Sequence, residues 1–208
     1  MPIENREELS LYDLLWDHSM DIVNLIMKTN FLTDMNLNTL QAERYTNMTI
    51  QDVYYIKAVY DILSTVVNEP WLPEDLKEFF SHIADGYYRF YKEMLIETRL
   101  KNTDSIVPSE AVAEYVSSYQ RVAQLERNKI YMVIALLPCS RLWPYISEHL
   151  NLTEDSPYYA FKKNNAKDGS REKYEKLLED HRKEICENTA LEIFRTQMNC
   201  ERKFFTSF

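Results

Sequence analysis

Three side chains in this 208-residue sequence combine a chemically useful group with apolar neighbours: Cys139, Asp52 and Glu201. Cys139 follows Pro138 in an apolar segment, and a proline inside a helix removes a hydrogen bond and kinks the chain, which can expose the sulfur to a cavity. Asp52 lies among aromatic residues, where an ionised carboxylate is costly unless it is paired. Glu201 precedes Phe204 and Phe205, and burial of its carboxyl by these side chains would raise its proton affinity.

Each of these residues also has a purely structural interpretation. An isolated cysteine is commonly a small buried hydrophobe. Asp52 fits a hydrogen-bonded structural acid, and Glu201 fits a surface acid close to the end of the sequence. The residue types alone leave these alternatives open.

Metal binding is a weaker possibility. The spacing of Glu78, His82 and Asp85 would place three potential ligands on one helix face, but no second matching set occurs in the sequence. The three cysteines, Cys139, Cys186 and Cys200, lack CxxC spacing and predict neither a zinc site nor a disulfide framework. We therefore expect no metal and no other cofactor.

Composition narrows the class of protein. The net charge of −9 and the absence of a Lys/Arg stripe disfavour nucleic acid as a partner. Only two glycines occur, Gly86 and Gly169, so tight hairpins and phosphate-binding loops are disfavoured. The first residues lack a signal-peptide pattern and no uncharged stretch reaches membrane-spanning length, so we expect a cytoplasmic protein that does not contact membranes.

Hydrophobic periodicity predicts an all-α protein in which residues 1–208 form a single domain. Proline and acidic residues mark helix starts near residues 74 and 108. Residues 162–170 form the clearest expected loop. The helices are expected at residues 7–28, 37–67, 74–99, 108–125, 128–150, 170–186 and 188–205.

Four segments, taken in order, resemble the motifs of the TenA/thiaminase II family. They are IQDVYYIKA at 50–58, EYVSSY at 114–119, ALLPCSRLW at 135–143 and ERKFF at 201–205. The resemblance implies a haem-oxygenase-like helical bundle without haem. It also implies a homo-oligomer, usually a tetramer or otherwise a dimer, that binds the aminopyrimidine half of thiamine.

The resemblance also assigns roles to individual residues. Cys139 would add to the pyrimidine ring as a nucleophile, Glu201 would protonate a ring nitrogen, and Asp52 would hold the amidine edge of the ring. Such covalent catalysis needs a thiol, an acid and a water-poor cavity. The product would be the hydroxymethylpyrimidine, formed from a thiamine-breakdown product without a cofactor.

The remaining roles concern the walls of the pocket. Tyr55 and Tyr115 would line or polarise it, and Phe204 would pack against the ring. Trp143 stands where many family members have a tyrosine, and Ala166 aligns with another usual pocket tyrosine. These two departures concern the identity of the substrate more than the fold.

Three functions compete at this point. The leading one is an aminopyrimidine hydrolase of the thiaminase II type that serves thiamine salvage. The alternative is a non-catalytic ligand-binding or regulatory protein on the same fold. A metal-dependent oxygenase on the same bundle is the least favoured of the three functions. The Glu and His metal ligands of metal-dependent relatives do not align with Glu78 and His82.

Overall fold

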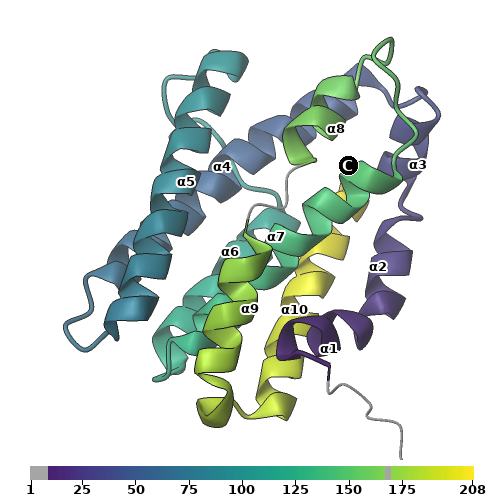
Figure 1. Cartoon of the computed structure of the whole chain (residues 1–208). Helices are drawn as coiled ribbons and strands as arrows, with labels where there is room; N and C mark the ends of the chain where they lie inside the picture. The colour runs from purple at the N-terminus through teal and green to yellow at the C-terminus, as the bar shows by residue number, and fades with distance from the viewer. Residues whose placement is uncertain (1–8, 167–169) are drawn as a thin grey trace, which may run out of the picture.

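The computed structural model describes residues 9–166 and 170–208, and within them the regular structure is helical, with no strand. The elements, shown in Figure 1, are α1 (Leu11–Asp17), α2 (Met20–Ile26), α3 (Asn30–Asn36), α4 (Ala42–Val67), α5 (Glu74–Thr98), α6 (Glu110–Leu125), α7 (Ile130–His149), α8 (Tyr159–Asn165), α9 (Arg171–Asp180), a 3₁₀ turn (Arg182–Glu184) and α10 (Glu187–Thr206). The all-α prediction is confirmed.

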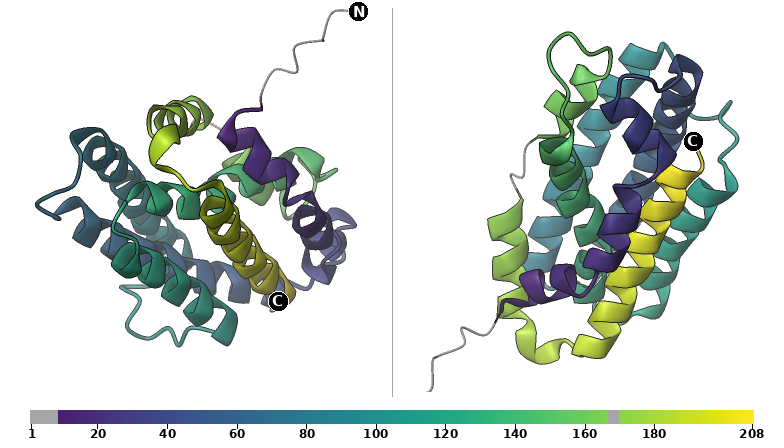
Figure 2. Two further views of the ribbon diagram at one scale, coloured as in Figure 1. Left: turned by 90° about the horizontal axis from the view of Figure 1, so that it is seen from below. Right: turned by 90° about the vertical axis from the view of Figure 1, so that its right-hand side faces the viewer.

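Helices α7 and α10 form the centre of the bundle. α10 packs against α7, α6 and α2, and it also contacts α1 and α3. In the left view of Figure 2 it runs between α1–α3 on one side and α4–α6 on the other. α4 and α5 form a long antiparallel pair that packs onto this centre through α6.

One expected long helix is divided, and another begins later than predicted. The predicted helix 7–28 is interrupted between α1 and α2, where the backbone of Ser19 leaves helical geometry. Ser19 is fully buried, and apolar residues face the core on both sides of the break. The hydrophobic period therefore continues across the turn and hides it. Residues 7 and 8 of that prediction lie outside the described residues.

The predicted helix 37–67 begins five residues later, at Ala42. A separate short helix, α3, ends just before Asn38, which has a left-handed backbone (φ 58°). Asparagine tolerates this conformation better than most residues, so Asn38 turns the chain between α3 and α4. The sequence prediction missed this turn signal.

The predicted loop 162–170 was partly wrong as well, because α8 continues to Asn165. Residues 167–169 lie outside the described part of the chain. The predicted helix 170–186 is shorter than expected, since α9 ends at Asp180 and a 3₁₀ turn follows. By contrast α6 begins as expected, with Ser109 capping it by accepting a hydrogen bond from the backbone N–H of Val112 (3.3 Å).

Helix α7 is apolar on nearly every face and remains helical through Pro138 and Pro144. Among the described residues it alone is long and apolar enough, by length and composition, to cross a membrane. However, 72% of its most apolar 18-residue window is buried inside the bundle, which is the position of a core helix. Each proline leaves a helix carbonyl without its usual donor, a local weakness next to Cys139.

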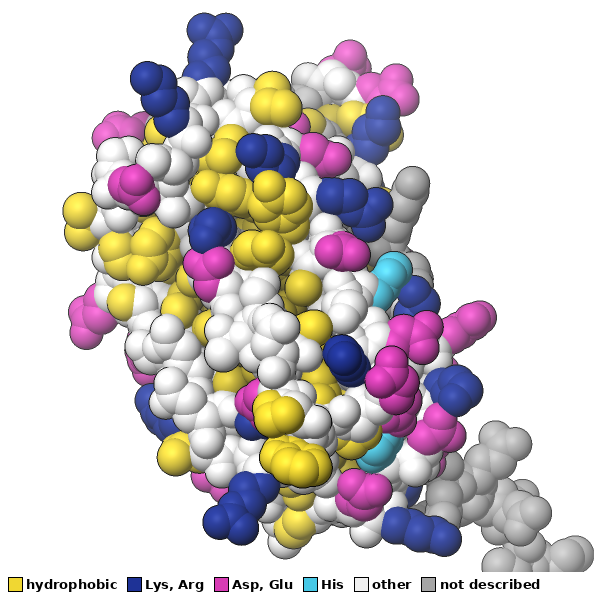
Figure 3. Space-filling model, turned by 90° about the vertical axis from the view of Figure 1, so that its left-hand side faces the viewer, with side chains coloured by type: hydrophobic (Ala, Val, Ile, Leu, Met, Phe, Trp, Pro, Cys, Tyr) yellow, Lys and Arg dark blue, Asp and Glu magenta, His cyan; other side chains and the backbone are white. Residues whose placement is uncertain are grey.

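The molecular surface on the side of α5 mixes Lys and Arg with Asp and Glu around several hydrophobic patches (Figure 3). On α5 itself, Tyr88, Phe90 and Ile96 are exposed. The predicted self-association stays a prediction.

Candidate active site

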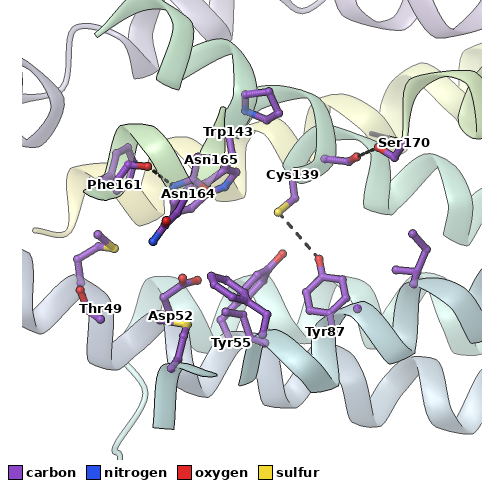
Figure 4. A pocket seen from close by; sticks show the side chains of 18 of the residues that line it. Thr49, Asp52, Tyr55, Tyr87, Cys139, Trp143, Phe161, Asn164, Asn165 and Ser170 are labelled. Atoms are coloured by element: carbon purple, nitrogen blue, oxygen red, sulfur yellow. Dashed lines mark hydrogen bonds between the residues drawn. The ribbon is translucent and has the colours of Figure 1, made fainter. Parts of the chain in front are cut away.

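A cavity of about 570 Å³ lies between α4, α5, α7 and α8. Its volume is within the usual range for pockets that hold small molecules. Figure 4 shows Asp52 and Tyr55 of α4 on one side and Cys139 and Trp143 of α7 opposite them. Because these residues are far apart in the sequence, the cavity depends on the packing of the whole bundle.

The thiol of Cys139 faces this cavity and is half-buried. The hydroxyl of Tyr87, on α5, donates to its Sγ over 4.0 Å (Figure 4). Burial raises the pKa of the thiol well above its usual value, and the nearby Glu201 carboxyl raises it further, while hydrogen bonds from Tyr55 and Tyr87 oppose the shift. The resting residue is therefore a neutral thiol that needs a proton acceptor before it can attack.

Asp52 projects into the cavity from α4 and is 8% exposed. Burial raises its pKa to about 8, and the charge of Glu201 contributes to the rise. No hydrogen bond to its carboxyl is present among the described residues. At neutral pH Asp52 is thus a carboxylic acid that offers one donor and one acceptor to a ligand.

Glu201, on α10, is almost fully buried and lies behind the cavity lining, next to Cys139 and Trp143. Burial raises its pKa to about 7, and the interactions with Tyr115, Trp143 and Cys139 lower it. Its Oε1 accepts a hydrogen bond from the Tyr115 hydroxyl at 2.7 Å. A carboxyl with a pKa near neutrality is suited to both taking and giving a proton.

A row of tyrosine hydroxyls connects Tyr55 with Glu201. The Tyr55 and Tyr119 oxygens lie 3.0 Å apart, and Tyr119 donates to Tyr115 at 3.1 Å. The rings of Tyr115 and Tyr119 stack with centroids 5.0 Å apart. Burial raises the pKa of Tyr55, Tyr115 and Tyr119 well above the usual value, so all three remain protonated.

The comparisons with known proteins agree with this geometry. The sequence profile of the TENA/THI-4/PQQC family matches residues 22–208. The chain belongs to this family.

Among solved structures, a TenA homologue from Pyrococcus furiosus is 20% identical, with a TM-score of 0.79 over 94% of this chain and 98% of its own. A TenA homologue from P. horikoshii OT3 is 22% identical, with a TM-score of 0.75 over 95% and 97% of the two chains. No curated protein matches the chain. The structural likeness establishes the haem-oxygenase-like bundle of TenA proteins as the fold.

Not every predicted site residue of this TenA-family protein reaches the cavity. Cys139, Asp52, Tyr55 and Trp143 line it. Tyr115 and Glu201 form a layer behind them, joined by their hydrogen bond. This arrangement brings the predicted nucleophile and acid together without exposing the acid to bulk water.

Phe204 occupies a different place from the one predicted. It is 2% exposed and packs against Phe205, with its ring centroid 6.2 Å from that of Trp143. It supports Trp143 from behind and is not among the described residues that line the cavity. The indole N–H of Trp143 is buried next to Glu201, although it does not reach hydrogen-bond geometry.

The aligned position Ala166 is exposed and does not line the cavity. Asn164 and Asn165 of α8 line that side instead (Figure 4). The wall that a tyrosine would form is therefore made of two amides, which can donate and accept hydrogen bonds to a substrate.

The candidate metal ligands do not form a metal site. No group of three His, Cys, Asp or Glu side chains within the described residues could hold a metal ion, which excludes a joint site for Glu78, His82 and Asp85. His82 lines the cavity, and its Nε2 lies 3.0 Å from Nζ of Lys173.

Two important residues were missed by the sequence analysis. Tyr119 ends the EYVSSY motif, four residues after Tyr115, so the helical period alone would have placed the two side by side. Tyr87 belongs to a run of aromatic residues with no local signal that separates it from core residues. Its contact with Cys139 depends on the packing of α5 against the cavity.

Proposed function

We propose that this protein is a cofactor-free hydrolase that converts 4-amino-5-aminomethyl-2-methylpyrimidine, or a related thiamine-breakdown product, to the hydroxymethylpyrimidine. The observation that carries the proposal is the pair formed by Asp52 and Cys139 across one cavity, with Glu201 behind the thiol. Family membership supports a thiaminase II-like function of this kind.

Asp52 would recognise the ring. The amidine edge of an aminopyrimidine presents one acceptor, a ring nitrogen, and one donor, the amino group. A protonated carboxyl presents the complementary pair, whereas a carboxylate only accepts. The raised pKa of Asp52, about 8, therefore matches a neutral aminopyrimidine better than an ordinary carboxylate would.

Cys139 and Glu201 would carry out the reaction. The thiol sulfur bonds to a ring carbon, its proton passes to Glu201, and Glu201 protonates a ring nitrogen as aromaticity is lost. The C–N bond of the protonated exocyclic amine then breaks and ammonia leaves. Water adds to the exocyclic carbon and releases one proton to solvent. The S–C bond then breaks and the ring nitrogen returns its proton through Glu201 to the sulfur, which restores the aromatic ring and the thiol.

An amine-release assay over thiamine and several aminomethylpyrimidines tests the proposal, with Cys139→Ser and Cys186→Ser as paired variants. Cys186 is exposed and far along the chain from the cavity residues of α7, so its substitution should leave turnover intact. We expect turnover by wild type and Cys186→Ser and none by Cys139→Ser. Binding of a pyrimidine without turnover by wild type would instead support a ligand-binding protein. If wild type neither binds nor turns over any of these pyrimidines, the proposed substrate class is wrong.

A further inference from the structure

Gly86 stands in the middle of helix α5, a position where glycine is costly. Glycine inside a helix lowers stability relative to alanine, because it loses more backbone freedom on folding. The whole sequence contains only two glycines, so the presence of one of them here is unusual. Three reasons for such a glycine are common: an unusual backbone angle, a close contact with another part of the chain, or room for a ligand.

The structure excludes the first two reasons. Within the described residues no glycine has a positive φ, so the backbone of Gly86 suits any helical residue. A Cβ added at Gly86 would lie more than 4 Å from every heavy atom outside its own helix backbone and its two neighbours in the chain. No other helix therefore packs so closely that it requires glycine here. Gly86 does line the cavity, which leaves room for a ligand as the reason.

The position of Gly86 relates it to one part of the substrate. Its neighbour Tyr87 reaches Cys139, so Gly86 lies on the α5 wall close to the thiol. Glu201 belongs to α10, which packs against α7, whereas α5 packs on α4. In the proposed reaction Glu201 protonates a ring nitrogen, and the aminomethyl group is on the ring carbon that is furthest from both nitrogens. The departing amine therefore points away from Glu201, towards the α5 wall.

We propose that Gly86 is a specificity-determining residue whose missing side chain leaves room for a substituent on the departing amine. The inference rests on the proposed function and names its substrate class: aminomethylpyrimidines whose exocyclic nitrogen carries a small apolar group. Ile83 and Phe90 line the cavity on either side of Gly86 along α5 and provide apolar surroundings. The cavity, of about 570 Å³, is also larger than a single pyrimidine ring needs. The C–N bond breaks as before, and the protonated, substituted amine leaves in place of ammonia.

The test compares wild type with Gly86→Ala and Gly86→Leu on the unsubstituted aminomethylpyrimidine and on its N-methyl and N-propyl derivatives. Wild type should turn over all three, and Gly86→Ala places a methyl group in the space that the substituent needs. For the N-propyl compound we expect kcat/KM of Gly86→Ala to fall by about 10-fold or more, mainly through KM. For the unsubstituted amine it should stay within about 2-fold, and Gly86→Leu should enlarge the difference between the two compounds.

Thermal unfolding provides an independent readout. Gly86→Ala should raise Tm by about 2–4 °C, because alanine is the better helix former and the added methyl group meets no neighbour. A lower Tm would show that the fold requires glycine at this position and would overturn the inference. Asp85→Ala is the matched control. Asp85 is the exposed neighbour on α5 and does not line the cavity, so this variant should keep the wild-type preference among the three amines.

The remaining outcomes separate this inference from the proposed function. An equal change in kcat/KM for all three amines, or none, would overturn the role of Gly86, and so would a wild type that is active only on the unsubstituted amine. If wild type turns over none of the three, the proposed function is refuted, and calorimetric binding of the same compounds decides about Gly86. Weaker binding of the N-propyl compound alone by Gly86→Ala would support the space at Gly86, whereas equal binding by both proteins, or no binding by either, would overturn it.

Discussion

Replacing Asp52 by asparagine should stabilise the unliganded protein. In the folded chain the pKa of Asp52 is raised from 3.8 to about 8 by burial and by Glu201. Above pH 3.8 the unfolded chain gains stability by ionising this carboxyl, and the folded chain does not until about pH 8. The folded state therefore loses stability as pH rises between these values, and asparagine does not ionise.

The magnitude follows from that interval. Between 3.8 and pH 7 lie roughly 3 pH units, and each is worth about 1.4 kcal/mol, so the cost at pH 7 approaches about 4 kcal/mol. Asp52 is 8% exposed, so solvent reaches part of its side chain, which makes this an upper limit. For a chain of this length about 1 kcal/mol changes Tm by roughly 2–4 °C. The gain from Asp52→Asn should thus approach about 10 °C at pH 7 and vanish near pH 4.

Thermal unfolding of wild type and Asp52→Asn at pH 4, 5, 6, 7 and 8 measures this gain directly. Asp61→Asn is the matched control, because Asp61 is exposed on the same helix and pairs with Lys57 at 2.6 Å. That variant should not be stabilised. A gain for Asp52→Asn that is the same at every pH, or a lower Tm at pH 7, would refute the reasoning.

Three further predictions concern catalysis. Cys139→Ser should abolish amine release while far-ultraviolet circular dichroism stays that of wild type; full activity would rule out the thiol as nucleophile. Glu201→Gln should lower kcat by about 100- to 10,000-fold at pH 7 with little change in KM, and near-normal turnover would exclude Glu201 as the acid. The wild-type KM should rise above about pH 8, where Asp52 loses the proton that it donates to the substrate. In Glu201→Gln this rise should begin at lower pH, since the charge that raises the pKa of Asp52 is removed, and an unchanged KM profile would show that the two acids are uncoupled.

The sequence was sufficient for the all-α fold because the helical period is strong in α4, α5, α6 and α10. It was insufficient at the turns. The period continues through Ser19, and Asn38, whose left-handed backbone turns the chain after α3, was not recognised as a turn residue. Boundaries depend on tertiary packing more than on local preference, so they were the less accurate part of the prediction.

The end of the chain shows the same limit. From the sequence, burial of Phe204, Phe205 and Phe208 is expected to hold the last helix in place, and removal of residues 200–208 is expected to eliminate catalysis but spare most of the fold. In the structure Phe204 and Phe205 are buried and α10 contacts α1, α2, α3, α6 and α7. Their removal would open the core of the bundle, so a truncation would test folding as much as catalysis.

The site residues were predicted as separate side chains, but their chemistry comes from being coupled. The Glu201 charge raises the pKa of both Cys139 and Asp52, although these two face each other from different helices. No sequence pattern contains that relation, because it depends on the distance of α10 from α4 and α7. At pH 7 Asp52 and Cys139 are neutral, and Glu201, with a pKa of about 7, is partly ionised behind the cavity lining. A neutral aromatic ring can then enter beside Asp52 without displacing a counter-ion, while the ionised fraction of Glu201 can accept the thiol proton.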